Sequence, residues 1–238
     1  MNRCRSMLAL QAQAWADVGY GSLLLDLHGT GDSAGEYGDA RWQHWLDDIH
    51  LATRWLSEQP GGCSHFLAIR LGAGLAAAAL RDQAAGVRGL VLWQPVADGK
   101  QHFTQFMRVK MAAQMDRPDL PKETTGSMRA QLSAGQPIEV AGYEIHPELA
   151  RALDSMQLGA LPPPAGTRVL WLEQPPPGAT ELAPASAQAL RSWQAGGLDV
   201  LWRPFEGPSF WQQHERVLAP ALITESAAWL ADEATART

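Results

Sequence analysis

Five short, continuously apolar segments punctuate this chain of 238 residues, and turn-forming residues flank each of them. The segments cover residues 22–27, 66–69, 89–93, 168–172 and 199–202. Continuous rather than alternating hydrophobicity is typical of strands that are buried on both faces of a parallel sheet. Patterns of helical period lie at the start of the chain and at about residues 41–57, 72–83, 184–194 and 214–232. The sequence therefore predicts an α/β fold, a mostly parallel sheet flanked by helices.

The interval between the third and fourth segments, residues 98–164, is longer than a single crossover helix needs. We expect it to be a helical cap inserted into one domain that spans residues 1–238, since 46% hydrophobic residues suffice for one core of this size. Met and Phe side chains recur there at near-helical spacing, namely Phe103, Phe106, Met107, Met111 and Met115. This stripe either packs on the sheet as an ordinary amphipathic face or forms a lid over an apolar ligand.

Composition and charge exclude several classes of function. A net charge of −6 without a basic face gives no electrostatic reason to bind nucleic acid. The two cysteines, Cys4 and Cys63, lack CxxC spacing and are too few for a disulfide scaffold, so no metal or other cofactor is expected. No apolar segment approaches the roughly 18 residues of a transmembrane helix, and the basic start is expected to be a helix rather than a signal peptide. We therefore expect a cytoplasmic protein.

A glycine-rich loop follows the first apolar segment and admits two interpretations. The pattern G-x-G-x-x-A at residues 29–34 matches the dinucleotide fingerprint, but that motif needs a helix that starts inside the loop. Here the helical pattern starts only at about residue 41. The alternative is a turn-rich loop in which the Ser33 hydroxyl satisfies nearby backbone groups. Ser33 also has acidic residues and a histidine beside it, yet residues so close in sequence rarely converge as a catalytic triad.

Longer passages resemble one known group of proteins. They are Asp-Leu-x-Gly-x-Gly-Asp-Ser-x-Gly at 26–35, Ile-Arg-Leu-Gly-Ala at 69–73, Leu-Trp-Gln-Pro-Val at 92–96, Gly-Lys-Gln-His at 99–102, Val-Ala-Gly-Tyr at 140–143 and Gly-Pro-x-Phe-Trp at 207–211. Together they look like the hydrolase-like proteins of the bacterial exosortase A (PEP-CTERM) system, within the α/β-hydrolase superfamily. The resemblance implies that fold, ester or thioester hydrolysis, and a protein partner in exopolysaccharide and envelope-protein export.

The turn at residues 70–72 carries the sharpest chemical constraint. A strand, a tight turn and a helix of small residues form the nucleophile elbow of an α/β-hydrolase, whose usual sequence is G-x-S-x-G. Here the serine position holds Arg70, followed by Leu71 and Gly72. The guanidinium stays protonated at physiological pH and cannot act as a nucleophile. Serine-type acyl transfer through this turn is therefore excluded.

The resemblance also implies where a catalytic acid and a histidine would lie, after the fourth strand and after the last one. The candidates at these places are Glu173 and His214, and no other residue is assigned a catalytic role. Gln94, Asp98 and His102 follow the third strand and are expected to line a pocket, because sites in open α/β sheets lie at the carboxyl ends of strands.

Two roles remain open for Arg70. In one, its charge and the free amides of Leu71 and Gly72 at a helix N-terminus hold a small acyl or anionic ligand. In the other, Arg70 pairs with Glu173 and fills a site that has lost its activity, since buried charges persist only when paired. The whole protein is then either an ester or thioester hydrolase, or a catalytically inactive pseudo-hydrolase that binds an anion, an acyl ligand or a partner.

The resemblance places a further strand before the helix at the start of the chain, centrally between the segments at residues 22–27 and 66–69. The N-terminal strands of the family pattern are absent from this sequence. Either the two neighbouring segments pair directly, or the reading frame begins upstream and Met1 is internal. We expect the second, because deleting a central strand leaves two rows of backbone groups unpaired. N-terminal sequencing of the native protein tests this expectation.

Overall fold

The computed structural model describes residues 2–82, 86–114, 122–212 and 215–235. Within them, one sheet of four parallel strands has the order β1-β2-β5-β6. The strands are β1 His65–Ile69, β2 Gly89–Trp93, β5 Arg168–Leu172 and β6 Asp199–Arg203. The predicted mostly parallel sheet is confirmed, and four of the five apolar segments form its strands.

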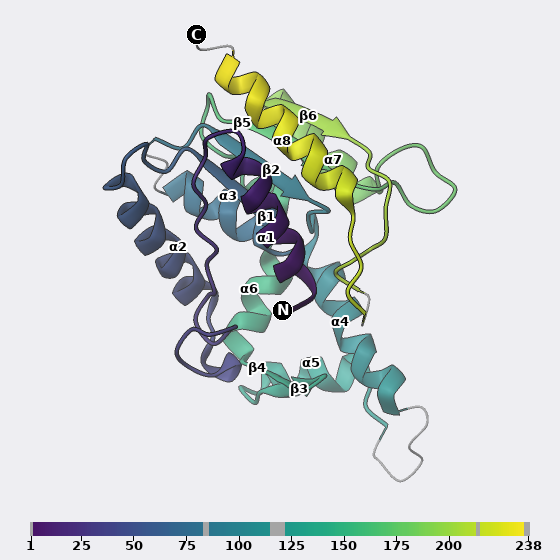
Figure 1. Cartoon of the computed structure of the whole chain (residues 1–238). Coiled ribbons are helices and arrows are strands. Elements are labelled where there is room, and N and C mark those ends of the chain that lie inside the picture. Colours follow the sequence, from purple (N-terminus) through teal and green to yellow (C-terminus); the bar gives the residue numbers. More distant parts are fainter. Residues whose placement is uncertain (1, 83–85, 115–121, 213–214, 236–238) are drawn as a thin grey trace.

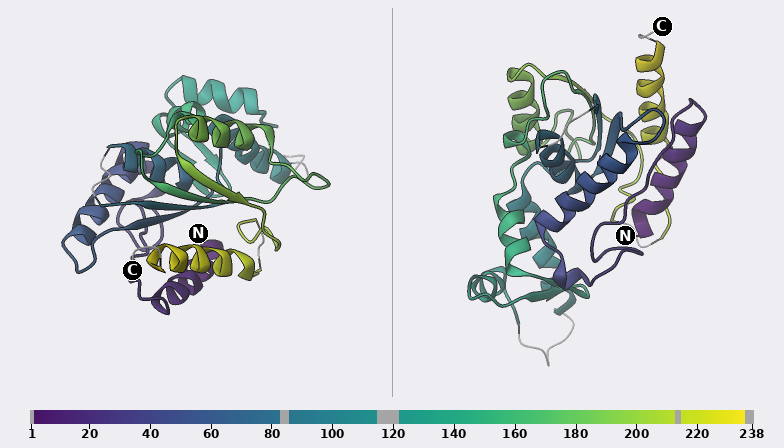
Figure 2. Two further views of the ribbon diagram at one scale, coloured as in Figure 1. Left: turned by 90° about the horizontal axis from the view of Figure 1, so that it is seen from above. Right: turned by 90° about the vertical axis from the view of Figure 1, so that its left-hand side faces the viewer.

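Helices cover both faces of this sheet (Figure 1 and Figure 2). One face carries α3 Gly72–Asp82 and α7 Pro184–Ala195, and the other carries α1 Asn2–Ala16 and α8 Pro220–Thr235. Successive residues of β2 therefore meet different helices: Leu92 lies in the core beneath α3 and α7, and Trp93 lies in the core beneath α1 and α8. Because β2 is buried at all five positions, its sequence is continuously apolar.

The remaining helix on this part of the fold, α2 Trp42–Ser57, packs on α3. The helices found at the start of the chain and in α2, α3 and α7 agree with the sequence prediction. The last helix is shorter than predicted, because it starts at Pro220 rather than near residue 214. Proline suits the first turn of a helix, where its missing N–H has no partner to lose. None of the described helices is long and apolar enough to cross a membrane.

The strand prediction for residues 22–27 is wrong. They run lengthwise between α1 and α2 as a stretched segment (Figure 1), and within the described part of the chain β1 pairs with β2 alone. Leu23, Leu24 and Leu25 keep 45%, 43% and 42% of their surface exposed. Leucine-rich sequence favours a buried strand, but a ladder forms only where a neighbouring backbone supplies its hydrogen bonds.

The described residues of the segment 98–164 form three helices, a short β-hairpin and a 3-10 turn. They are α4 Gly99–Gln114, α5 Thr125–Ser133, β3 Ile138–Val140, β4 Tyr143–Ile145, α6 Pro147–Ser155 and η2 Leu158–Ala160; a further 3-10 turn, η1 Tyr37–Asp39, precedes α2. The hairpin is not predicted by the sequence analysis. It turns through Ala141 and Gly142, whose φ angles of 53° and 81° match the two positive values that a type I′ turn requires.

The Met and Phe stripe of the insertion packs as core. Phe103 and Met107 are buried in a cluster that also contains residues of α2 and α3, and Phe106 and Met111 pack against it. Met115 lies outside the described residues. The packing interpretation thus accounts for the described part of the stripe, since a lid over an apolar ligand would leave these side chains facing a cavity.

Candidate functional site

The turn between β1 and α3 holds Arg70 in a left-handed conformation, with φ of 53°. Backbone hydrogen bonds fix this turn: Arg70 N donates to Trp93 O at 3.1 Å, and its carbonyl accepts from Val96 N and Ala73 N at 3.1 Å each. A non-glycine residue in this region costs about 1–3 kcal/mol and persists only where its surroundings determine it. The strained strand-turn-helix geometry of a nucleophile elbow is therefore present, with arginine at its tip.

The Arg70 side chain is largely buried at the carboxyl edge of the sheet. Its Nη1 donates to the Gln94 carbonyl oxygen at 3.0 Å, and its guanidinium carbon lies 5.4 Å from the centroid of the Trp211 ring. Burial lowers the pKa of the guanidinium, and attraction from Glu173 and Cys4 opposes that effect. Among the described residues, no carboxylate oxygen lies within 4.0 Å of it.

Glu173 does not form the direct ion pair with Arg70 that one interpretation of the sequence requires. Its carboxylate is 4% exposed and accepts hydrogen bonds from Trp171 Nε1 and Ser186 Oγ, both at 2.7 Å. Burial raises the pKa of this carboxyl, while these hydrogen bonds and the charge of Arg70 oppose the rise. Glu173 thus acts on Arg70 at longer range and ties β5 to α7.

We expect Glu173→Gln to become more stable relative to wild type as pH rises. The pKa of Glu173 is raised in the folded state, so its stabilising contribution is complete below the unfolded value near 4.5 and is lost as pH rises through the folded value. Glutamine keeps an acceptor for Trp171 or Ser186 and carries no charge. Urea unfolding of both proteins at pH 5 and pH 8 measures the difference. A stability difference between variant and wild type that stays constant from pH 5 to pH 8, or shifts toward wild type, would contradict the expectation.

The residues predicted to line a pocket have separate roles. Gln94 also has a positive φ, 45°, and its Oε1 accepts from Gln174 N at 2.9 Å. His102 is half-buried; burial, and secondly the charge of Arg70, lower its pKa to about 4. Asp98 caps α4 by accepting from Gln101 N at 2.8 Å. The structure therefore brings Gln94 and His102 to Arg70, and it turns Asp98 to a helix terminus.

Of three other residues, one lies outside the described part of the chain and two have local structural roles. His214 lies outside the described residues. Ser33 Oγ donates to the Asp26 carbonyl oxygen at 2.5 Å and its amide donates to Thr30 O, as a turn-forming serine does. Cys63 is buried ahead of β1, at the opposite end of that strand from the elbow, and burial raises the pKa of its thiol. Neither Ser33 nor Cys63 occupies the nucleophile position.

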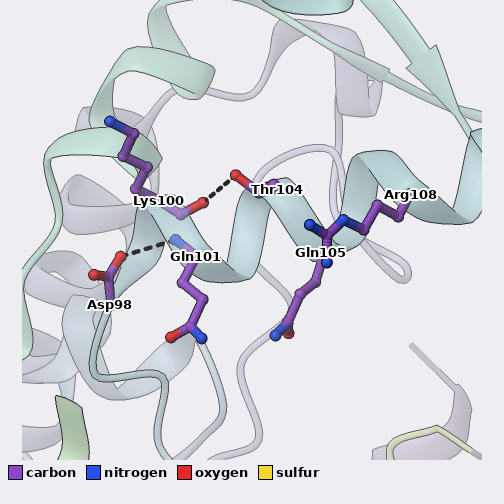
Figure 3. A pocket seen from close by; sticks show the side chains of 6 residues that line it. All are labelled: Asp98, Lys100, Gln101, Thr104, Gln105 and Arg108. Carbon is purple, nitrogen blue, oxygen red and sulfur yellow. Dashed lines mark hydrogen bonds between the residues drawn. The ribbon is translucent and has the colours of Figure 1, made fainter. Parts of the chain in front are cut away.

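A smaller and a larger hollow are lined by described residues, and Arg70 and Gly72 are among the residues that line the larger one. A shallow polar one of about 310 Å³ runs along α4 (Figure 3) and is lined by Asp98, Lys100, Gln101, Thr104, Gln105 and Arg108. A larger apolar cavity of about 510 Å³ separates residues 20–27 from β1. No described group of three His, Cys, Asp or Glu side chains is placed to hold a metal ion.

Trp211 is a residue of the site that the sequence did not predict. The ring lies over Arg70 and forms edge contacts with Phe205 and Phe210. The one available signal was the phrase Gly-Pro-x-Phe-Trp at 207–211, which contributes to the family resemblance without indicating a contact with Arg70.

A family model described as "Serine aminopeptidase, S33" matches residues 4–154, which include the elbow. The chain belongs to this family. The serine aminopeptidase S33 match and the α/β-hydrolase structures below establish the superfamily that the sequence motifs resemble. Arg70 occupies the tight turn between β1 and α3. No curated protein sequence matches the chain.

Solved structures of α/β-hydrolases share the fold. Est1E from Butyrivibrio proteoclasticus, with ferulic acid bound, has a TM-score of 0.63 at 13% identity over 96% of this chain and 82% of that one. Alpha/beta hydrolase domain-containing protein 10 from mouse has a TM-score of 0.60 at 16% identity, covering 96% and 85%. Tomato methylketone synthase I, complexed with 2-tridecanone, has a TM-score of 0.57 at 11% identity, covering 94% and 92%. At these identities the likeness shows the fold alone.

Proposed function

We propose that this serine aminopeptidase S33 family member binds the anionic group of a small acid at Arg70 and does not hydrolyse esters through its elbow. The observation that carries the proposal is the arginine itself, held at the elbow tip with φ of 53°. A protonated guanidinium cannot attack a carbonyl carbon, whereas it is a strong donor to carboxylate or phosphate oxygens.

The surroundings of Arg70 favour an anion. The amides of Leu71 and Gly72 lie at the N-terminus of α3, and no hydrogen bond between described residues occupies them. A helix N-terminus carries partial positive charge and presents free N–H groups to an anion. His102 is neutral at pH 7, because its pKa is about 4, so it contributes no charge to anion binding. Arg70 therefore supplies the positive charge for the proposed anion, and Glu173, the nearby carboxyl that acts on it, is held apart by Trp171 and Ser186.

We further propose that the protein acts within the exosortase A system, beside a protein partner and in the cytoplasm. Two of the phrases that carry this resemblance, Leu-Trp-Gln-Pro-Val at 92–96 and Gly-Lys-Gln-His at 99–102, supply Gln94 and His102. Gly99 of the second phrase allows close packing, since a Cβ there would lie 2.1 Å from the Leu153 carbonyl oxygen. The part of the resemblance that supplies Gln94 and His102 supports a ligand shared with that system.

Calorimetric titration with butyrate and with inorganic phosphate tests the anion proposal. We expect Arg70→Gln to weaken binding of the better probe about 30-fold, the equivalent of one charged hydrogen bond of about 2 kcal/mol. Arg108→Gln, an exposed arginine on α4, is the matched control and should bind as wild type does. Equal affinities of wild type and Arg70→Gln would overturn the proposal.

Hydrolysis of p-nitrophenyl butyrate tests the enzyme alternative. We expect no turnover by wild type beyond the buffer rate, because the elbow offers no nucleophile. Turnover that is abolished in Glu173→Gln or His214→Asn would instead identify an unusual hydrolase that uses those groups. Turnover that survives both substitutions would place a catalytic site elsewhere in the chain.

A further inference from the structure

The strand β6 ends the sheet on the side away from α2 (Figure 1), and within the described residues it pairs with β5 alone. The Arg203 carbonyl oxygen accepts from Glu173 N at 3.3 Å, so the backbone groups of residues 199, 201 and 203 point toward β5. Those of Val200 and Trp202 point away from the sheet, and no backbone hydrogen bond between described residues occupies them. Such a row of N–H and C=O groups is a template for another strand.

The outer edge of β6 is only lightly covered. Gln194 Nε2 donates to the Val200 carbonyl oxygen at 3.3 Å, which is a long hydrogen bond from an exposed side chain of α7. A carbonyl oxygen has two lone pairs, so this bond leaves room for a second donor. The Val200 N–H and both backbone groups of Trp202 have no such side-chain cover among the described residues. The edge can therefore accept a strand without a rearrangement of β6.

The side chains of β6 have a symmetric pattern of charge. Asp199, Leu201 and Arg203 share one face of the strand, because alternate side chains point the same way. Asp199 Oδ2 lies 3.2 Å from Arg168 Nε, and Arg203 Nη1 lies 2.6 Å from Glu225 Oε2 on α8. Leu201 between them is 37% exposed. An acidic and a basic residue thus stand at equal spacing on either side of an exposed leucine.

This pattern is complementary to itself when a second copy of β6 lies antiparallel about Leu201. Val200 then lies opposite Trp202 of the second copy, and each such pair exchanges both of its N–H···O bonds through outward-pointing groups. Asp199 lies opposite Arg203 of the second copy, and Leu201 lies opposite its own counterpart. A shift by one residue would oppose outward groups to inward ones. A shift by two residues in either direction would place a charge opposite Leu201.

The charges on this edge favour a second copy rather than guard against one. Edge strands are commonly protected by charges of one sign, which repel an identical strand. Opposite signs at mirrored positions attract in an antiparallel pair. At each end of the paired strands, Arg168, Asp199 and the second copy's Arg203 and Glu225 would alternate in sign. A network of this kind is worth more than an isolated exposed ion pair.

We propose that β6 pairs antiparallel with β6 of a second copy about Leu201, so that the two sheets continue into each other across a two-fold axis. Such an interface uses the same surface on both copies. Because one short strand supplies most of the contact, we expect a reversible dimer with a dissociation constant of about 10–100 µM. β6 lies at the opposite end of the sheet order from β1, which leads into Arg70, so dimerisation does not depend on anion binding.

Sedimentation velocity of the whole chain between about 2 and 500 µM tests the proposal, and wild type should pass from monomer to dimer. Asp199→Arg opposes two arginines at each end of the interface, and Arg203→Asp opposes two aspartates. Each single variant should weaken dimerisation about tenfold or more. An equimolar mixture of the two variants should dimerise as wild type does, because every facing pair is then opposite in sign.

Arg54→Asp, a charge reversal at an exposed position of α2, is the matched control and should dimerise as wild type does. Exposed ion pairs contribute little to stability, so the variants should stay folded, which urea unfolding verifies. Hydrogen exchange of the Val200 and Trp202 amides should slow as the wild-type concentration rises. A wild type that remains monomeric at the highest concentration would overturn the proposal. So would a dimer that both single variants retain, or a mixture that fails to restore dimerisation.

Discussion

Trp93→Ala should lower the free energy of unfolding by about 3–5 kcal/mol, the usual cost of truncating a fully buried aromatic side chain. Trp93 is 0% exposed at the carboxyl end of β2, and its ring makes an edge contact with Phe210 at a centroid distance of 6.2 Å. Its Nε1 donates to Ser226 Oγ at 2.9 Å, which links the central strand to α8. The substitution removes both the packing and a buried hydrogen bond.

Urea unfolding measures this loss, with Trp55→Ala as the matched control. Trp55 is 52% exposed on α2, so its truncation should change stability by at most about 0.5 kcal/mol. Trp93→Phe keeps an aromatic ring but leaves the buried Ser226 hydroxyl without its donor, and should fall between the two. The unfolding free energy of Trp93→Phe can still be measured if Trp93→Ala does not fold. Equal stabilities of Trp93→Ala and Trp55→Ala would contradict the described core.

The folded protein should lose about 2–3 kcal/mol of stability between pH 6.5 and pH 4 through His102 alone. In the unfolded chain this imidazole takes up a proton near pH 6.5. In the folded chain burial, and then the charge of Arg70, depress its pKa to about 4. Between these values the unfolded state binds the proton and the folded state does not, so stability falls as pH falls.

His102→Gln isolates this effect. From pH 7 to pH 4.5 the variant should lose less unfolding free energy than wild type. At pH 8 both side chains are neutral, so the difference in unfolding free energy between the two proteins there reports packing alone. Titration of the His102 ring by NMR gives the folded pKa directly. A ring that titrates near 6.5 would contradict the burial and the proximity to Arg70 described above.

The sequence identified most of the fold because hydrophobic periodicity is a local signal. The segments at 66–69, 89–93, 168–172 and 199–202 are strands, and helices follow them as predicted. The segment at 22–27 carries the same signal and is no strand, because pairing depends on a neighbouring backbone that residues 22–27 cannot encode. The hairpin at 138–145 was not predicted from the sequence, because each of its strands has three residues and such a short strand leaves no detectable pattern.

For the candidate site, the identity of residue 70 is read from the sequence and limits the chemistry of the turn that follows β1. Arginine at position 70 excludes an elbow nucleophile whatever surrounds it, since protonation is a property of the residue. The partners of that charge follow from the fold. The Gln94 carbonyl and the Trp211 ring contact Arg70, and Glu173 is held by Trp171 and Ser186. Partner choice depends on distances of a few ångströms between separate elements, because Coulomb and hydrogen-bond energies decay on that scale.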